Sequence, residues 1–127
     1  MKHYLLIEDD DIDVMITERM VKTIDPILMA IIAKDGGQAM AFLEKCMEES
    51  NIPRPEFIIL DLMMPIMDGF EFLEIYEKKF YPNFKKLPII VASSSTHGED
   101  RKKVEHYPFV KKFVSKPLQK EDVIELI

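Results

Sequence analysis

Short apolar runs, each followed by a segment of helical length, constrain the fold of this chain more than any other feature. The runs are bounded by polar or turn residues and cover residues 4–7, 27–33, 57–60, 89–92 and 113–114. Unbroken apolar runs of this length are typical of strands that are buried on both faces. Repeated alternation of strand and helix predicts a parallel sheet with helices on both sides. We therefore predict an α/β fold of the doubly wound, flavodoxin-like (βα)5 type with a five-stranded parallel sheet.

The intervening segments support this prediction because their apolar residues recur at the spacing of one helix face. The first segment carries Ile12, Ile16, Met20 and Ile24 in steps of four. The second carries a stripe of Ala39, Phe42, Leu43, Cys46 and Met47, and the third a stripe of Gly69, Phe72, Leu73, Tyr76 and Phe80. The fourth, residues 98–107, is mostly charged, and the last, residues 119–127, is short for a closing helix.

Composition limits the function classes open to the chain. Its 127 residues match one ordinary domain, so we expect a single domain over residues 1–127. The net charge of −6 argues against a nucleic-acid-binding face and against a polybasic membrane surface. The single cysteine excludes an internal disulfide. No apolar stretch approaches the length of a membrane span, and the N-terminus lacks the pattern of a signal peptide, so we expect a cytoplasmic protein.

Charged and hydroxyl groups follow four of the five predicted strands. An acidic run, residues 8–11, follows the first strand, and Asp61 follows the third. Ser93 follows the fourth strand, and Lys116 follows the fifth. The carboxyl ends of parallel strands meet at one edge of a sheet, which is where doubly wound folds place their sites. We therefore expect these side chains to gather at that edge.

Glu8, Asp9 and Asp61 would bring three carboxylates to this edge. Like charges this close raise one another's pKa unless a cation compensates them, and Mg²⁺ is usually held by one or two carboxylates with water and phosphate oxygens. Lys116 would add positive charge from across the site. A metal and a lysine that flank a carboxylate suit phosphoryl transfer, in which the carboxylate is the nucleophile and forms an aspartyl phosphate.

Five sequence motifs lie along these predicted elements. They are LLIEDD at the acidic run, AKDGGQAMAFL at the second strand-to-helix passage, IILDLMMPIMDGFEFL around Asp61, LPIIVASSS at Ser93 and FVSKPL at Lys116. With these motifs the chain resembles, over its whole length, the receiver domain of two-component response regulators, and DLMMPIMDG is the most specific of the five. Since no output domain follows, we expect a stand-alone receiver of the chemotaxis or relay type.

The resemblance implies a role for each matching residue. Asp61 matches the phosphoacceptor, and Glu8 and Asp9 match the acidic pair that holds Mg²⁺. The backbone carbonyl of Met63 matches the position that completes the metal shell. Ser93 matches the switch hydroxyl.

The last strand carries two further matches that the resemblance implies. Lys116 matches the family's lysine, and its bond to Pro117 is typically cis in that family. Phe113 matches the aromatic switch position, which is expected to turn inward on activation. Residues 97–127 would form the face that changes and binds an output partner.

The implied function is a phosphorylation-controlled switch. A histidine kinase or a histidine phosphotransfer protein would donate the phosphoryl group to Asp61 in an Mg²⁺-dependent reaction. The chain would not be an enzyme beyond its own phosphorylation and slow autodephosphorylation. A phosphohydrolase of the haloacid dehalogenase type is disfavoured because Met63 stands where those enzymes carry a second aspartate. A receiver-like interaction module that works without phosphorylation is the alternative.

The acidic run leaves its own register open between Glu8 with Asp9 and Asp9 with Asp10. We favour Glu8 and Asp9 because they follow the strand directly, whereas Asp10 or Asp11 suits the cap of the next helix. Asp13 is expected on the solvated face of that helix.

Overall fold

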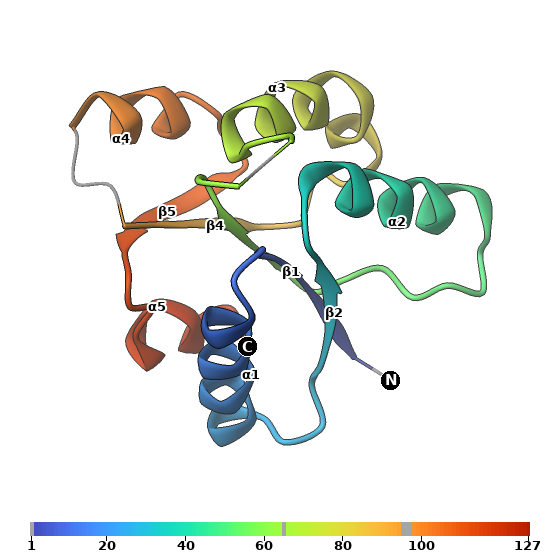
Figure 1. Cartoon of the computed structure of the whole chain (residues 1–127). Helices are drawn as coiled ribbons and strands as arrows, with labels where there is room; N and C mark the ends of the chain where they lie inside the picture. The colour runs from blue at the N-terminus through green and yellow to red at the C-terminus, as the bar shows by residue number, and fades with distance from the viewer. Residues whose placement is uncertain (1, 65, 95–97) are drawn as a thin grey trace.

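A five-stranded parallel sheet lies between two layers of helices in the computed structural model, which describes residues 2–64, 66–94 and 98–127 (Figure 1). The strands are β1 (His3–Ile7), β2 (Met29–Ala33), β3 (Ile58–Asp61), β4 (Ile89–Ser93) and β5 (Val110–Ser115). Their order across the sheet is β2-β1-β3-β4-β5. The helices are α1 (Asp11–Ile24), α2 (Gly36–Glu48), α3 (Gly69–Lys79), α4 (Gly98–Glu105) and α5 (Lys120–Ile124), with a short 3₁₀ helix at Tyr81–Asn83. The predicted doubly wound α/β fold is confirmed.

The two faces of the sheet carry separate apolar cores. Figure 1 shows α1 and α5 on one face and α2, α3 and α4 on the other. Successive side chains of a strand point to opposite faces. In β1, Leu5 and Ile7 therefore pack toward α2 and α3, whereas Tyr4 and Leu6 pack toward α1 and α5. This explains why the strand reads as an unbroken apolar run.

The last strand is longer than its apolar run predicts. β5 begins at Val110, three residues before the predicted run, and includes Lys111 and Lys112. As an edge strand it pairs only with β4, and its register shifts between Ile89 and Ile90. Lysines are common on edge strands because they discourage pairing with another chain. The two lysines interrupted the apolar pattern without interrupting the strand.

The face that α1 buries coincides only in part with the predicted stripe, of which Met20 and Ile24 pack against the core. Its buried residues are Val14, Thr17 and Val21, whereas Ile12 is 64% exposed and Ile16 is 47% exposed. Both stripes have helical spacing, so periodicity alone could not choose between them. The way the helix packs on the sheet buries the stripe of Val14, Thr17 and Val21.

Aspartates cap the N-termini of the first three helices. The side chains of Asp10, Asp35 and Asp68 each accept backbone N–H groups from the first turn of α1, α2 and α3. These caps satisfy N–H groups that have no partner within the helix. The assignment of Asp10 as a cap is confirmed, and it fixes how the chain leaves β1.

Gly69 lets α3 start directly against the end of β3. A Cβ atom at this position would lie 2.7 Å from the Leu62 Cα atom and 2.9 Å from the Asp61 carbonyl oxygen. Its N–H also donates to the Leu62 carbonyl at 2.9 Å. Because two of its three nearest neighbours are backbone atoms, rotation of the Leu62 side chain alone cannot make room.

We therefore expect Gly69→Ala to lower the free energy of unfolding by about 1–3 kcal/mol, the cost of overpacking a fixed backbone contact. Urea denaturation measures it. Gly98→Ala is the matched control, since a Cβ there meets nothing within 4 Å; it should leave stability unchanged or slightly higher. Equal stability of Gly69→Ala and wild type would contradict the close approach.

No helix among the described residues combines the length and the apolar character that crossing a bilayer needs.

Candidate functional site

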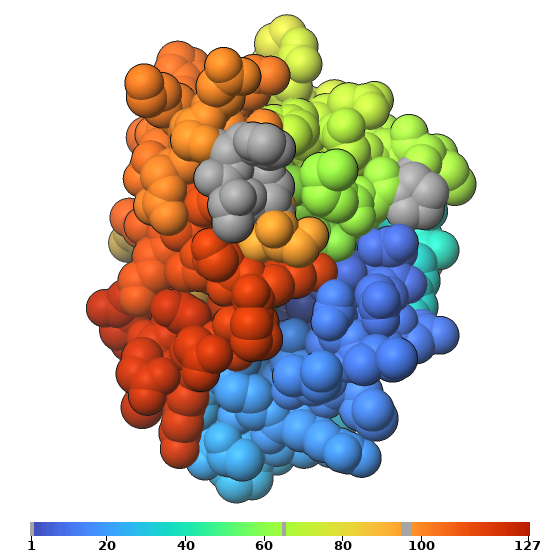
Figure 2. Space-filling model, turned by 60° about the vertical axis from the view of Figure 1, so that its left-hand side comes forward, coloured from blue at the N-terminus to red at the C-terminus, as the bar shows by residue number. Residues whose placement is uncertain are grey.

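Three chain segments far apart in sequence meet at the carboxyl edge of the sheet. Figure 2 shows the start of α1 in blue, the loop after β3 in green and the end of β5 in red-orange on the same face. β3 lies at the centre of the sheet, with β1 and β4 as neighbours. The side chain that ends β3 is therefore surrounded by the residues that end the other strands.

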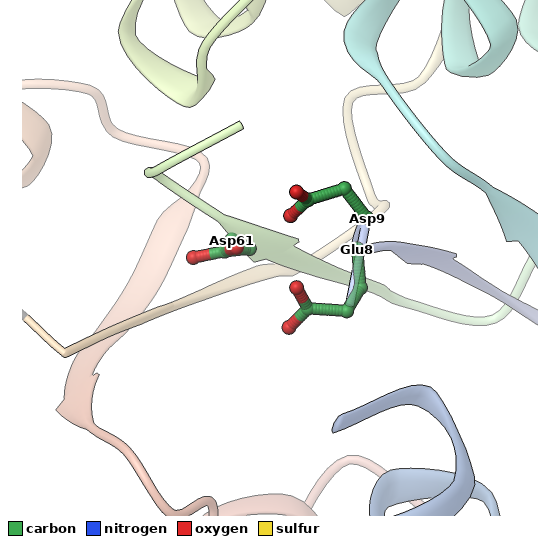
Figure 3. A group of neighbouring side chains, drawn as sticks. All are labelled: Glu8, Asp9 and Asp61. Atoms are coloured by element: carbon green, nitrogen blue, oxygen red, sulfur yellow. The ribbon is translucent and has the colours of Figure 1, made fainter. Parts of the chain in front are cut away.

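Glu8, Asp9 and Asp61 form a cluster of carboxylates at this edge. Each offers an oxygen, and these oxygens lie within 4.8 Å of one another. Figure 3 shows the three carboxyl groups extending to the same side, Glu8 and Asp9 from the end of β1 and Asp61 from the end of β3. Glu8 and Asp61 are each only 4% exposed, whereas Asp9 is open to solvent. A group of hard oxygen donors this close fits a divalent cation.

Lys116 supplies the positive charge of the site. Its ammonium Nζ lies 2.7 Å from Glu8 Oε1, 2.9 Å from Asp13 Oδ2 and 3.4 Å from Asp61 Oδ2. The backbone N–H of Lys116 donates to the Ser93 carbonyl at 2.9 Å, which ties the end of β5 to the end of β4. The following bond to Pro117 is cis, as the sequence resemblance implies.

The pKa values of Glu8 and Lys116 both respond to this crowding. The pKa of Glu8 is raised to about 7, chiefly by burial; the Lys116 hydrogen bond lowers it and the neighbouring Asp61 carboxyl raises it. Burial alone would lower the pKa of Lys116, but hydrogen bonds to Glu8 and Asp13 and the charge of Asp61 outweigh it and raise that pKa. Lys116 is therefore a permanent cation, whereas Glu8 titrates near neutrality.

The structure distinguishes the two possible acidic pairs, Glu8 with Asp9 and Asp9 with Asp10, because Asp9 and Asp10 point to different places. Asp9 belongs to the carboxylate cluster with Glu8 and Asp61. Asp10 instead turns to α1, where its Oδ1 accepts the N–H groups of Ile12 and Asp13 at 2.8 and 3.2 Å. The geometry favours Glu8 with Asp9 as the acidic pair.

Met63, Ser93 and Ser94 surround the phosphoacceptor candidate. The N–H of Met63 donates to Asp61 Oδ1 at 3.2 Å, so each oxygen of Asp61 has a positive or donor group beside it. Ser93 ends β4 as a buried residue, directly after Ala92, which is the register partner of Asp61. Ser94 and Met63 line the acidic pocket itself.

Phe113 is already inside the protein. It is 7% exposed, is the register partner of Val91 in β4, and lies in the core under α4. The guanidinium carbon of Arg101 lies 5.0 Å from the centre of its ring. The expected inward turn of Phe113 therefore has no outward starting point in this conformation.

Asp13 is the site residue that sequence reasoning missed. It was expected on the solvated face of α1, yet its carboxylate accepts a hydrogen bond from Lys116 Nζ at 2.9 Å. The helical spacing rule gave no signal for it, because Asp9 and Glu8 lie before α1 begins at Asp11. The residue that begins the predicted output face, 97, lies outside the described residues.

The arrangement places the buried carboxylate of Asp61 in one cluster with Glu8 and Asp9 and 3.4 Å from the Lys116 ammonium group. Such a carboxylate can act as a nucleophile toward phosphorus, while the cation opposite balances charge on the transferring group. The donor set is of oxygen type and contains no buried thiolate or imidazole. It suits a hard divalent ion.

Comparison with known proteins agrees with this chemistry. Residues 4–127 match the family model described as the response regulator receiver domain. The chain is 35% identical over 126 residues to response regulator Rcp1 of Synechocystis, covering 99% of this chain and 84% of Rcp1. It is 29% identical over 129 residues to the two-component response regulator ARR17 of Arabidopsis thaliana, covering 98% of this chain and 81% of ARR17.

Solved structures are similar over nearly the whole chain. A two-component response regulator from Cytophaga hutchinsonii superposes with a TM-score of 0.85 at 26% identity, covering 99% of this chain and 93% of that one. The phosphorylated cyanobacterial phytochrome response regulator RcpA gives 0.78 at 28% identity, covering 98% and 87%. The Mn²⁺-bound form of Rcp1 gives 0.71 at 32% identity, covering 99% and 88%.

Proposed function

The chain belongs to the response regulator receiver domain family, and we propose that it takes a phosphoryl group onto Asp61 from a histidine kinase or a histidine phosphotransfer protein. As the receiver domain of a two-component response regulator, it is a signalling component and not an enzyme that turns over a free substrate. We propose further that residues 1–127 form one receiver domain and that it works in the cytoplasm, where such donors carry their phosphohistidine.

The proposed reaction is an in-line displacement at phosphorus. A carboxylate oxygen of Asp61 forms the new O–P bond while the P–N bond to the donor histidine breaks and the imidazole nitrogen keeps the electron pair. In hydrolysis a water oxygen attacks phosphorus and the Asp61 O–P bond breaks. Its electron pair stays on the Asp61 carboxylate, and inorganic phosphate leaves with the protons of the water. Lys116 remains protonated throughout and faces the oxygens on which negative charge collects.

One observation carries this proposal: the buried Asp61 carboxylate lies 3.4 Å from the Lys116 ammonium and within the same cluster as Glu8 and Asp9. Incubation with acetyl phosphate and Mg²⁺, followed by intact mass spectrometry, tests it. We expect one phosphoryl group per chain, lost again on standing. A protein that never gains this mass would favour the alternative, a receiver-like module that binds partners without phosphorylation.

We propose Mg²⁺ as the cation, held by Glu8, Asp9, Asp61 and the backbone carbonyl of Met63. Two observations support the choice: the donors are oxygens, and a related response regulator, Rcp1, has been solved with Mn²⁺ bound. When bound, the ion neutralises carboxylate and phosphoryl charge. Asp9, the most exposed member of the cluster, is the one that solvent and ion reach first.

Metal affinity should depend on pH because protons and Mg²⁺ compete for Glu8. Since the pKa of Glu8 is raised to about 7, its carboxyl is mostly protonated at pH 6 and mostly ionised at pH 8. The apparent Mg²⁺ affinity should therefore be about tenfold weaker at pH 6 than at pH 8. Titrations followed by amide chemical shifts measure it.

Glu8→Gln is the matched control for this pH effect, since it keeps the shape of the side chain and cannot ionise. It should bind Mg²⁺ weakly at both pH values, with little difference between them. A wild-type affinity that is the same at pH 6 and pH 8 would contradict the assignment of Glu8 to the metal site.

We propose that phosphorylation is transmitted to residues 97–127, of which 98–127 are described. The phosphoryl group adds negative charge and three acceptor oxygens. The hydroxyl of Ser93, which follows the register partner of Asp61 in β4, would donate to one of them. Ser93 ends β4, and β4 pairs with β5 at Phe113, whose ring packs under α4. A shift of β4 toward Asp61 therefore disturbs α4 and β5 together, because close-packed elements cannot move independently.

Ser93→Ala should accept the phosphoryl group at Asp61 but respond weakly to it. Beryllofluoride imitates the phosphoryl group, and amide chemical shifts across 98–127 report the response. Wild type should show changes throughout α4 and β5, whereas Ser93→Ala should show them mainly around Glu8, Asp61 and Lys116. Identical shift patterns in both proteins would show that the Ser93 hydroxyl does not transmit the signal.

A further inference from the structure

Asp13 joins α1 to the loop that follows β5. It lies in the first turn of α1, and its Oδ2 atom accepts a hydrogen bond from Lys116 Nζ at 2.9 Å. The side chain of Lys116 is 20% exposed and that of Asp13 is 38% exposed, so the pair lies at the rim of the site and not on the open surface. The two residues are 103 positions apart in sequence, and this bond fixes where the long lysine side chain ends.

The three carboxylates around Lys116 are not equivalent. Glu8 and Asp61 belong to the group of carboxylates that can share a cation, and within the described part of the chain that group leaves Asp13 out. A divalent ion bound by Glu8 and Asp61 would compete with Lys116 for these two carboxylates and would also repel the ammonium group. Asp13 is the one carboxylate contact of Lys116, among those described, that such an ion does not claim.

From this difference we propose that Asp13 is a positioning residue that keeps the Lys116 ammonium in the site when Mg²⁺ occupies it. The proposal rests on the proposed function, since it concerns the lysine that faces the phosphoryl group. Without Asp13, the flexible side chain of Lys116 would be pushed toward solvent by the ion at the moment when the reaction needs it. Charge-assisted hydrogen bonds of this kind are stronger than neutral ones and fix direction as well as distance.

The first test compares labelling rates at saturating Mg²⁺ with acetyl phosphate as donor. Asp13→Asn removes the charge and keeps the shape, and it should slow labelling about fivefold, as expected for loss of one partly exposed charge-assisted bond. Asp11→Asn is the matched control. It removes the same charge from the same turn of α1, but Asp11 pairs with Lys34 and not with Lys116. Asp11→Asn should label within about twofold of wild type. Asp13→Glu should recover most of the rate, since it restores the carboxylate.

The second test observes the lysine itself and needs no phosphorylation. The side-chain ammonium signal of Lys116, identified by its loss in Lys116→Met, is followed by nitrogen-15 NMR while Mg²⁺ is added. In wild type and Asp11→Asn the signal should remain visible and protected from solvent exchange at saturating Mg²⁺. In Asp13→Asn it should broaden or disappear as the metal binds, while thermal melts of all variants stay close together.

The outcomes separate this proposal from the proposed function. If wild type takes no phosphoryl group, the proposed function fails, and the ammonium signal still decides the role of Asp13. If wild type labels but Asp13→Asn behaves as Asp11→Asn in rate and in the Mg²⁺ titration, the proposal is overturned while the phosphoacceptor assignment stands.

Discussion

Replacing Asp61 by asparagine should abolish phosphoryl labelling by acetyl phosphate and Mg²⁺. An amide nitrogen or oxygen cannot form the acyl phosphate, and Asp61 is the proposed nucleophile in the cluster with Glu8 and Asp9, 3.4 Å from Lys116. The fold should persist, because asparagine keeps the oxygen that accepts the Met63 N–H group. Labelling is measured by intact mass, and folding by urea denaturation.

Asp68→Asn is the matched control for this prediction. Asp68 follows Asp61 by seven residues, caps α3 through Glu71 N–H, and lies outside the carboxylate cluster. Asparagine caps helices as well as aspartate does. Asp68→Asn should therefore label like wild type, and an Asp61→Asn protein that labels at the wild-type rate would show that Asp61 is not the phosphoacceptor.

The second large effect is expected for Lys116→Met, which preserves much of the side-chain length but removes the charge. Glu8, Asp13 and Asp61 would lose the cation that they share. Phosphoryl transfer should slow by about 100-fold or more, as when a single group that stabilises developing charge is removed. Mg²⁺ affinity should rise at the same time, because the site becomes more negative and no ammonium repels the ion.

These opposite changes distinguish loss of Lys116 from loss of the site. A disrupted site would lose both labelling and metal binding, whereas removal of the ammonium lowers one and raises the other. Lys111→Met is the control, since Lys111 is an exposed lysine on β5, the strand that ends directly before Lys116. Lys116→Met with a wild-type labelling rate, or with weaker Mg²⁺ binding, would contradict the role given to the lysine.

The buried strands of this fold were predictable from sequence because a strand that is covered on both faces consists almost entirely of apolar residues. β3 and β4 are buried along their whole length, so up to the site residues Asp61 and Ser93 that end them they read as unbroken apolar runs. Edge strand β5 was predicted too short because lysines, which are common on exposed edge strands, interrupt its apolar residues. In α1 the predicted stripe was right for Met20 and Ile24 but wrong for Ile12 and Ile16, which are exposed although they are bulkier than the buried residues Val14 and Thr17.

The site residues likewise divide into those that the sequence predicts and those that depend on tertiary packing. Glu8, Asp61 and Lys116 follow strands directly, so the rule that parallel strands end at one edge brings them together from sequence alone. Asp13 does not follow a strand, and its contact with Lys116 depends on how α1 is rotated over β1. Periodicity does not specify that rotation. Phe113 lies inside for a similar reason, since the position of α4 and Arg101 above it is a tertiary property.

Chemical mapping of the phosphorylated residue in the wild-type protein tests the central claim most directly. Borohydride reduces an acyl phosphate and converts the labelled aspartate to homoserine, which peptide mass spectrometry then locates. After incubation with acetyl phosphate and Mg²⁺, we predict homoserine at position 61 and at no other aspartate. Homoserine at Asp9, Asp10 or Asp13, or none at any position despite a folded, metal-binding protein, would contradict the account.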